Sequence, residues 1–131
     1  MDKKKVLIID DEVDFCLLMQ FYLSKKNCDV NISHTLQDGL VQVADYSPDI
    51  VILDNNLPDG LGWPAANNIL EAAPNVHLFL ISANKPSNKS DYHDKGDKID
   101  VVEKPISISQ IDKFLRWLLN SFILWKNILN P

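Results

Sequence analysis

The 131-residue sequence is poor in features that would crosslink it or carry it into a membrane. Its two cysteines, Cys16 and Cys28, match no pattern of metal ligands, so free thiols in a reducing compartment are expected. No apolar run is long enough for a signal peptide or a membrane span, which predicts a cytoplasmic protein. Because internal repeats and interdomain linkers are also lacking, we expect a single domain over residues 1–131.

Positive charge is scarcer than negative charge in this chain. Thirteen Lys and Arg residues stand against 18 Asp and Glu residues, which gives a formal net charge of −5. Direct nucleic-acid binding is not expected, because it depends on Lys and Arg side chains that neutralise phosphates. Hydrophobic residues make up 46% of the chain and charged residues 24%, as in ordinary globular proteins.

Short apolar runs alternate with segments of helical periodicity along the chain. The runs predict strands over residues 5–9, 29–33, 49–53, 76–81 and 99–102. The periodic segments, and the capping signals that precede two of them, predict helices over residues 13–26, 35–46, 64–73 and 107–129. This alternation is typical of βαβ units and a parallel sheet.

The composition of the predicted strands indicates their order in the sheet. Strands 5–9, 49–53 and 76–81 are almost wholly apolar, as strands covered on both faces are. Strand 29–33 alternates and strand 99–102 is short and charged, as edge strands are. These features predict an α/β, flavodoxin-like fold: a doubly wound five-stranded parallel sheet in the order 2-1-3-4-5, with helices on both faces.

Carboxylates follow two strands that this order makes neighbours. Asp10 and Asp11 end the first strand, and Asp54 ends the third. Like charges at close range destabilise a fold unless a cation offsets them, and Mg2+ prefers oxygen ligands. Mg2+ is therefore the predicted cofactor. Pro58 and Gly60 predict a sharp turn that carries the chain away from this pocket.

Two further strand ends lie at the same predicted edge. They carry Ser82 with Ala83, and Lys104 with Pro105. An ionised carboxylate such as Asp54 attacks phosphorus without a general base, and a hydroxyl and an ammonium can then bind the phosphoryl oxygens. The set predicts phosphoryl transfer to the protein itself.

In this order, the motifs VLIIDDE, LDNNLPDG, SA and KP resemble the receiver domain of two-component response regulators. The resemblance covers residues 5–118. It implies that Asp54 is the phosphoacceptor and that Mg2+ is bound by Asp11, Asp54 and the backbone carbonyl of Asn56, with Asp10 in the acidic pocket.

The resemblance also implies partners and a signalling role. A sensor histidine kinase or a phosphotransfer protein supplies the phosphoryl group, which Ser82, the backbone of Ala83 and Lys104 then bind. Phosphorylation alters the face formed by the last strand and the last two helices. The chain is accordingly expected to be a switch, not a metabolic enzyme, with only self-catalysed transfer and slow autodephosphorylation.

Three features depart from the family pattern, and all concern the output face. Val101 stands where the family often has a ring, Gly96 lies eight residues before Lys104, and segment 85–95 has Tyr92 as its only large apolar residue. A phosphate-independent interaction module therefore remains an alternative, as does the N-terminal receiver of a longer DNA-binding regulator.

A hydrolase that uses an aspartyl-phosphate intermediate is a further alternative. Asn56 disfavours it, because a second acid would be needed at that position. Structural roles are expected for the histidines, for Trp63 in packing, and for Glu12 as a favourable charge at a helix N-terminus. The histidines are His34, His77 and His93.

The last predicted helix carries an apolar stripe longer than the sheet beneath it. A helix over 107–129 spans roughly 33 Å, whereas a five-residue strand spans about 17 Å. Residues 119–131 would then extend beyond the domain core, or fold back on it. Phe122, Trp125 and Leu129 form the predicted contact surface for a second copy of the chain or another partner.

Overall fold

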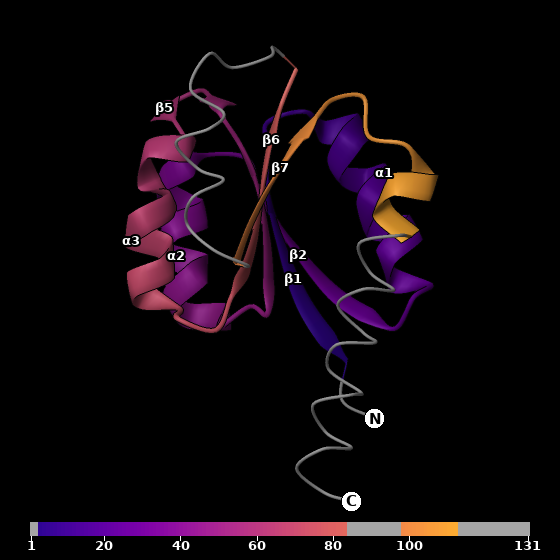
Figure 1. Cartoon of the computed structure of the whole chain (residues 1–131), viewed down its shortest axis with the longest axis horizontal. Helices are drawn as coiled ribbons and strands as arrows, with labels where there is room; N and C mark the ends of the chain where they lie inside the picture. The colour runs from indigo at the N-terminus through magenta and orange to yellow at the C-terminus, as the bar shows by residue number, and fades with distance from the viewer. Residues whose placement is uncertain (1–2, 84–97, 113–131) are drawn as a thin grey trace, which may run out of the picture.

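The computed structural model describes residues 3–83 and 98–112, which form a parallel sheet with helices on both sides (Figure 1). Its strands are β1 (Lys4–Ile9), β2 (Cys28–Ser33), β3 (Ile50–Asp54), β6 (His77–Ser82) and β7 (Ile99–Glu103). They are arranged in the order β2-β1-β3-β6-β7, and every neighbouring pair is parallel. The predicted doubly wound order is confirmed, with β2 and β7 at the edges.

The central strands are apolar because both of their faces are covered. Every residue of β3 and β6 is buried, as are the last four residues of β1. Since successive side chains of a strand point to opposite faces, the same strands supply two separate cores. The carboxyl ends of the strands lie towards the top of Figure 1.

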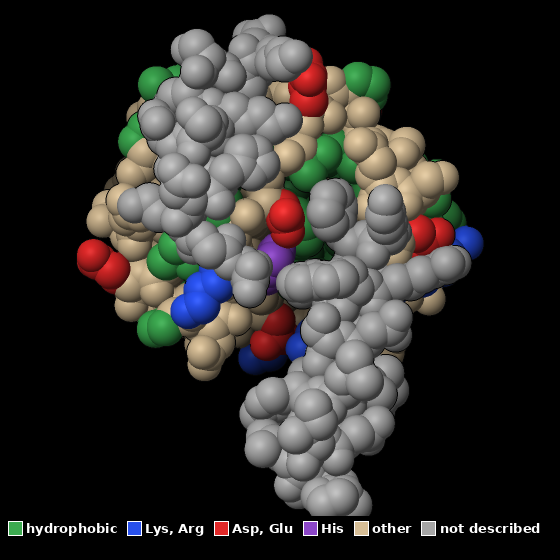
Figure 2. Space-filling model, in the orientation of Figure 1, with side chains coloured by type: hydrophobic (Ala, Val, Ile, Leu, Met, Phe, Trp, Pro, Cys, Tyr) green, Lys and Arg blue, Asp and Glu red, His purple; other side chains and the backbone are tan. Residues whose placement is uncertain are grey.

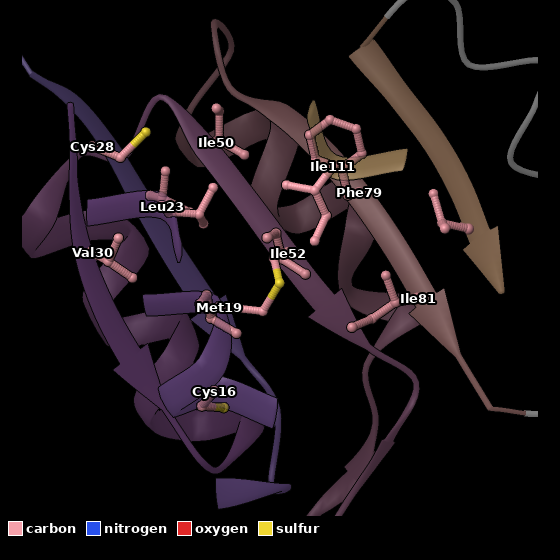
Figure 3. Packing of buried hydrophobic residues seen from close by; sticks show 13 residues of the cluster. Cys16, Met19, Leu23, Cys28, Val30, Ile50, Ile52, Phe79, Ile81 and Ile111 are labelled. Carbon is pink, nitrogen blue, oxygen red and sulfur yellow. The ribbon is translucent and has the colours of Figure 1, made fainter. Parts of the chain in front are cut away.

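One core lies between the sheet and α1 (Val13–Ser24). Met19 and Leu23 of α1 pack into it together with Ile52 of β3 and Ile81 of β6 (Figure 3). Ile111, from the helical residues 108–112, belongs to the same core. The second helix of this face therefore begins beside α1, as Figure 1 shows.

The other core lies between the sheet and two helices, α2 (Leu36–Tyr46) and α3 (Ala66–Ala72). Gly39 allows α2 to approach β1 closely. A Cβ at Gly39 would lie 2.6, 2.8 and 2.9 Å from three atoms of the Ile9 side chain. The position of α2 over the sheet thus depends on the absence of a side chain at Gly39.

The two predicted capping boxes have different outcomes. The Ser107 backbone N–H donates to Gln110 Oε1 over 2.9 Å, and the Gln110 N–H donates to Ser107 Oγ over 3.1 Å, which is the complete reciprocal box. At α2 only half of the box forms. The Asp38 N–H donates to Thr35 Oγ1 over 3.1 Å, but the Asp38 carboxylate accepts from the Ser33 hydroxyl instead.

Several element boundaries differ from the predictions. β3 and β6 each begin and end one residue later than the predicted ranges 49–53 and 76–81, so that Asp54 and Ser82 lie within them as their last residues. The predicted helix over 64–73 begins as a 3-10 turn, Trp63–Ala65, before α3 starts. A short antiparallel hairpin, β4 (Asn56–Leu57) with β5 (Gly60–Leu61), was not predicted; in it Leu57 pairs with Gly60 across the turn.

Some predictions fall outside the described residues. They include the segment 85–95 and the surface of Phe122, Trp125 and Leu129, which stay predictions. Among residues 3–83 and 98–112, no helix is long and apolar enough to cross a membrane. The described surface seen in Figure 2 shows acidic, basic and apolar side chains intermixed.

We expect Gly39→Ala to lower the free energy of unfolding by about 1 kcal/mol. Alanine favours a helix over glycine by about 1 kcal/mol, but overpacking a core costs about 1–3 kcal/mol, and the crowded Ile9 side chain is fully buried. Equilibrium denaturation in urea measures the change. Ile9→Val is the matched background, because it removes the most crowded methyl group and should reduce the cost. A Gly39→Ala protein more stable than wild type contradicts this packing argument.

Candidate functional site

Three carboxylates meet at the carboxyl edge of the sheet. Asp54 ends β3, and Asp10 and Asp11 directly follow β1, its neighbour in the sheet. One oxygen from each carboxylate lies within 4.8 Å of the others. Asp10 is fully buried and Asp54 is nearly so, whereas Asp11 is exposed. The strand order therefore brings these carboxylates together, as the sequence predicted.

Lys104 supplies the positive charge of the site. Its Nζ lies 2.8 Å from Asp10 Oδ2, 3.0 Å from Glu12 Oε1 and 4.0 Å from Asp54 Oδ1. The contact with the buried Asp10 is the shortest of the three and brings an ammonium to Asp10 Oδ2. Burial alone would lower the pKa of Lys104, but its contacts with the carboxylates raise that pKa overall. The ammonium therefore stays charged.

The Asp54 carboxyl is held in an environment that disfavours its charge. Burial raises its pKa to about 6, the negative charge of Asp10 adds to the shift, and Lys104 opposes it. At neutral pH Asp54 is therefore ionised, and its charge lowers the free energy of unfolding. Asp10 Oδ1 accepts a hydrogen bond of 2.8 Å from the backbone N–H of Glu12.

The backbone after Asp54 is fixed by contacts that sequence reasoning missed. The Gly62 N–H donates to the Asn55 carbonyl over 2.8 Å, and the Trp63 N–H donates to Asn55 Oδ1 over 3.1 Å. A Cβ at Gly62 would lie 2.1 Å from the carbonyl oxygen of Asp54. In the sequence, only an amide residue before the turn (Asn55) and a glycine after it (Gly62) could have suggested these contacts.

The turn of the hairpin reaches across to α2. Asp59 Oδ1 and Oδ2 accept hydrogen bonds of 2.8 and 2.9 Å from the backbone N–H groups of the first two residues of α2. These bonds lower the pKa of Asp59. Pro58 and Gly60 flank Asp59, and Gly60 has a φ of +146°, which favours glycine. Asn56, in contrast, is exposed in β4 beside the pocket.

The peptide of Asp10 is anchored by groups from two other elements. Its N–H donates to the Ser33 carbonyl over 2.9 Å, and its carbonyl lies 2.9 Å from His34 Nδ1 and 3.3 Å from Cys16 Sγ. Burial, with added repulsion from Asp10, raises the pKa of the Cys16 thiol to about 12. Far from this pocket, His77 Nε2 lies 2.6 Å from Asp100 Oδ2.

The remaining predicted residues lie at the carboxyl ends of β6 and β7, at the same edge of the sheet. Asp54 pairs with the residue before Ser82, so Ser82 and Ala83 follow directly beside it. Ser82 is buried, and its carbonyl accepts from the Lys104 N–H over 2.9 Å. The Lys104–Pro105 peptide bond is cis.

The charges of the pocket fit a divalent cation. Within the described part of the pocket, Asp10, Glu12 and Asp54 lie within 4.0 Å of the Lys104 ammonium, and Asp11 adds a further carboxylate to the aspartate cluster. Asp11 is exposed, and one of its carboxylate oxygens lies within 4.8 Å of an oxygen of each other aspartate. A cation could therefore reach these oxygens from solvent. Hard oxygen ligands with room for water are the ligand set that Mg2+ prefers.

Comparison with known proteins identifies similar chains. The family model described as "Response regulator receiver domain" matches residues 6–116. The KDP operon transcriptional regulatory protein KdpE of Escherichia coli is 31% identical over 111 residues, which are 85% of this chain and 49% of that protein. The response regulator protein PilR of Pseudomonas aeruginosa is 24% identical over 111 residues, 25% of its length. The chain thus spans half or less of these relatives.

Solved structures show the same fold. The signal receiver domain of a putative LuxO repressor protein from Vibrio parahaemolyticus has a TM-score of 0.82 at 20% identity, over 98% of each chain. A CheY-like response regulator receiver domain protein from Methanospirillum hungatei has a TM-score of 0.82 at 18% identity, over 91% of this chain and 95% of the other.

We expect Asp54→Asn to raise the free energy of unfolding by about 1–3 kcal/mol near pH 7.5 without Mg2+, at about 1.4 kcal/mol per pKa unit. The pKa of Asp54 rises from 3.8 to about 6 on folding, so its charge destabilises the folded state fully above about pH 6. The gain should therefore shrink as pH falls from 6 towards 4. Urea denaturation across this range measures it, with the exposed Asp14→Asn as control. A gain that is constant with pH contradicts the assigned cause.

Proposed function

Because the chain belongs to the family of response regulator receiver domains, we propose that it accepts a phosphoryl group on Asp54 and thereby switches its binding to a partner protein. One observation carries the choice of residue. Asp54 is a buried carboxylate with a second carboxylate and an ammonium beside it, at the carboxyl edge of the sheet. Asp10 shares that edge, but both of its oxygens are already in contact with protein groups.

The proposed reaction transfers the phosphoryl group from a donor to an Asp54 carboxylate oxygen. A bond forms between that oxygen and phosphorus, and the bond from phosphorus to the donor breaks, with its electron pair leaving on the donor. No general base is needed, because a pKa of about 6 leaves Asp54 ionised at neutral pH. We propose no turnover on other substrates, only this self-catalysed transfer and slow loss of the group.

The other residues would neutralise charge around the phosphoryl group. Receiver domains generally use Mg2+ at an acidic pocket, and we propose that Asp11, Asp54 and the Asn56 carbonyl hold it here, with Asp10 behind them. When bound, Mg2+ supplies positive charge against the phosphoryl oxygens. Lys104, 4.0 Å from Asp54 Oδ1, would bind one of these oxygens.

Two groups at the end of β6 complete the proposed phosphoryl site. The Ser82 hydroxyl and the Ala83 backbone N–H would donate to phosphoryl oxygens, since both follow the strand that pairs with β3. The donor would be a sensor histidine kinase or a phosphotransfer protein in the cytoplasm.

A role within a longer regulator is the second reading. It is favoured by the printed name of KdpE, a transcriptional regulatory protein, of which this chain matches 49%. In that reading another part of the protein would contact DNA, while these residues keep the switching role. Direct nucleic-acid binding by the acidic chain itself is not proposed.

Incubation with acetyl phosphate and Mg2+ should add a single phosphoryl group to the intact chain. The addition should depend on Mg2+ and be absent in Asp54→Asn, because that amide cannot attack phosphorus. Intact mass spectrometry measures both, and Asp14→Asn is the matched control that should be labelled like wild type. A label that survives in Asp54→Asn refutes the acceptor assignment. A chain that is never labelled favours the phosphate-independent module.

Mg2+ should raise the melting temperature of the protein, because it offsets repulsion among the clustered aspartates. Asp11→Asn should stabilise the metal-free protein, since one negative charge is removed, and should reduce the rise produced by Mg2+. Differential scanning calorimetry at a series of Mg2+ concentrations measures both effects. Asp14→Asn should keep the full rise. An Asp11→Asn protein with an undiminished rise contradicts Asp11 as a ligand.

A further inference from the structure

The Lys104 ammonium has a neighbour that is not a carboxylate. Its Nζ lies 4.6 Å from the centre of the Phe15 ring, on the first turn of α1. A cation over an aromatic face at this distance is attracted by the negative face of the ring. Phe15 is only partly buried, and it borders the same surface groove as Lys104, Pro105 and Ile106. The Phe15 ring therefore lies beside the head of this lysine, at the border of the groove.

The three other neighbours of the ammonium are not equivalent. Asp10 is fully buried, so its contact with Lys104 cannot be replaced by water without opening the fold. Glu12 is the solvent-facing partner: its side chain is 59% exposed, although its Oε1 lies 3.0 Å from the ammonium. Asp54, the proposed acceptor, lies farther away at 4.0 Å. An ammonium has three hydrogens to share among these acceptors.

We propose that Phe15 is a positioning residue that holds the Lys104 ammonium over the pocket, and that Glu12 is the partner the ammonium releases when phosphoryl oxygens arrive at Asp54. The inference rests on the proposed function of Asp54. An aromatic ring suits the positioning role, because it attracts the ammonium and leaves its N–H groups free to donate hydrogen bonds to the phosphoryl oxygens. Glu12 suits the exchangeable place, because its own side chain is 59% exposed and water can hydrate its carboxylate after the ammonium leaves.

The same helix provides a matched control for this contact. Lys25 Nζ lies 4.3 Å from the centre of the Phe21 ring, so α1 carries a second cation–ring pair. Phe21 is exposed and Lys25 has no part in the pocket. Phe21→Leu therefore makes the same chemical change on the same helix without touching Lys104.

The test compares Phe15→Leu, Phe15→Tyr and Phe21→Leu with wild type. We measure the rate of labelling by acetyl phosphate, and the binding of beryllofluoride with Mg2+ by its protein-bound 19F NMR signal. Phe15→Leu should weaken beryllofluoride binding and slow labelling by about 3-fold, the range of an exposed cation–π contact. Phe15→Tyr, which keeps the ring, and Phe21→Leu should both resemble wild type. Glu12→Gln should instead strengthen beryllofluoride binding by about 2-fold.

A double-mutant cycle separates positioning from packing. In a Lys104→Met background, Phe15→Leu should cause no further loss, because the ammonium it positions is gone. Equal losses with and without Lys104 overturn the inference, as do equal behaviour of Phe15→Leu and Phe21→Leu, or opposite effects from Glu12→Gln. If wild type itself takes no phosphoryl group, the proposed function fails and the inference falls with it. Labelled wild type with an unaffected Phe15→Leu refutes the inference alone.

Discussion

The close approach of two buried carboxylates is the constraint on which the other features of this site depend. Asp10 and Asp54 lie on adjacent strands, almost out of contact with water, and one ammonium serves both. Such an arrangement is costly, as the raised pKa of Asp54 shows. It persists because the two strands are locked in register by apolar cores on both faces, which leave the carboxylates no way to separate.

The loops around the pocket are joined to one another and to α2 by hydrogen bonds. Ser33 and His34, before α2, bind the peptide of Asp10, and Asp59, after β3, binds the amides that begin α2. Asn55 closes the hairpin that contains Asp59. A shift in any one of these loops is therefore transmitted to the others, which makes the edge of the sheet a connected unit.

The fold and the charged cluster were predictable because they depend on periodicity and strand order alone. Continuous apolar runs marked the central strands, and parallel strands necessarily place Asp10, Asp54 and Lys104 at one edge. The hairpin, the tight approach at Gly62 and the ring of Phe15 beneath the lysine were not predictable. They depend on distances between side chains that are remote in sequence, and Phe15 has the helical spacing of an ordinary core residue.

The two hydrogen bonds that Asp59 accepts make the start of α2 depend on a residue outside the helix. Its first two amides are completed by a residue that is synthesised later and belongs to the turn after β3. For protein engineering this means that α2 is not a transferable cassette. A chimera that exchanges residues 34–46 between related chains must import the matching turn at Asp59, or the first two amides of the helix will exchange this carboxylate for water.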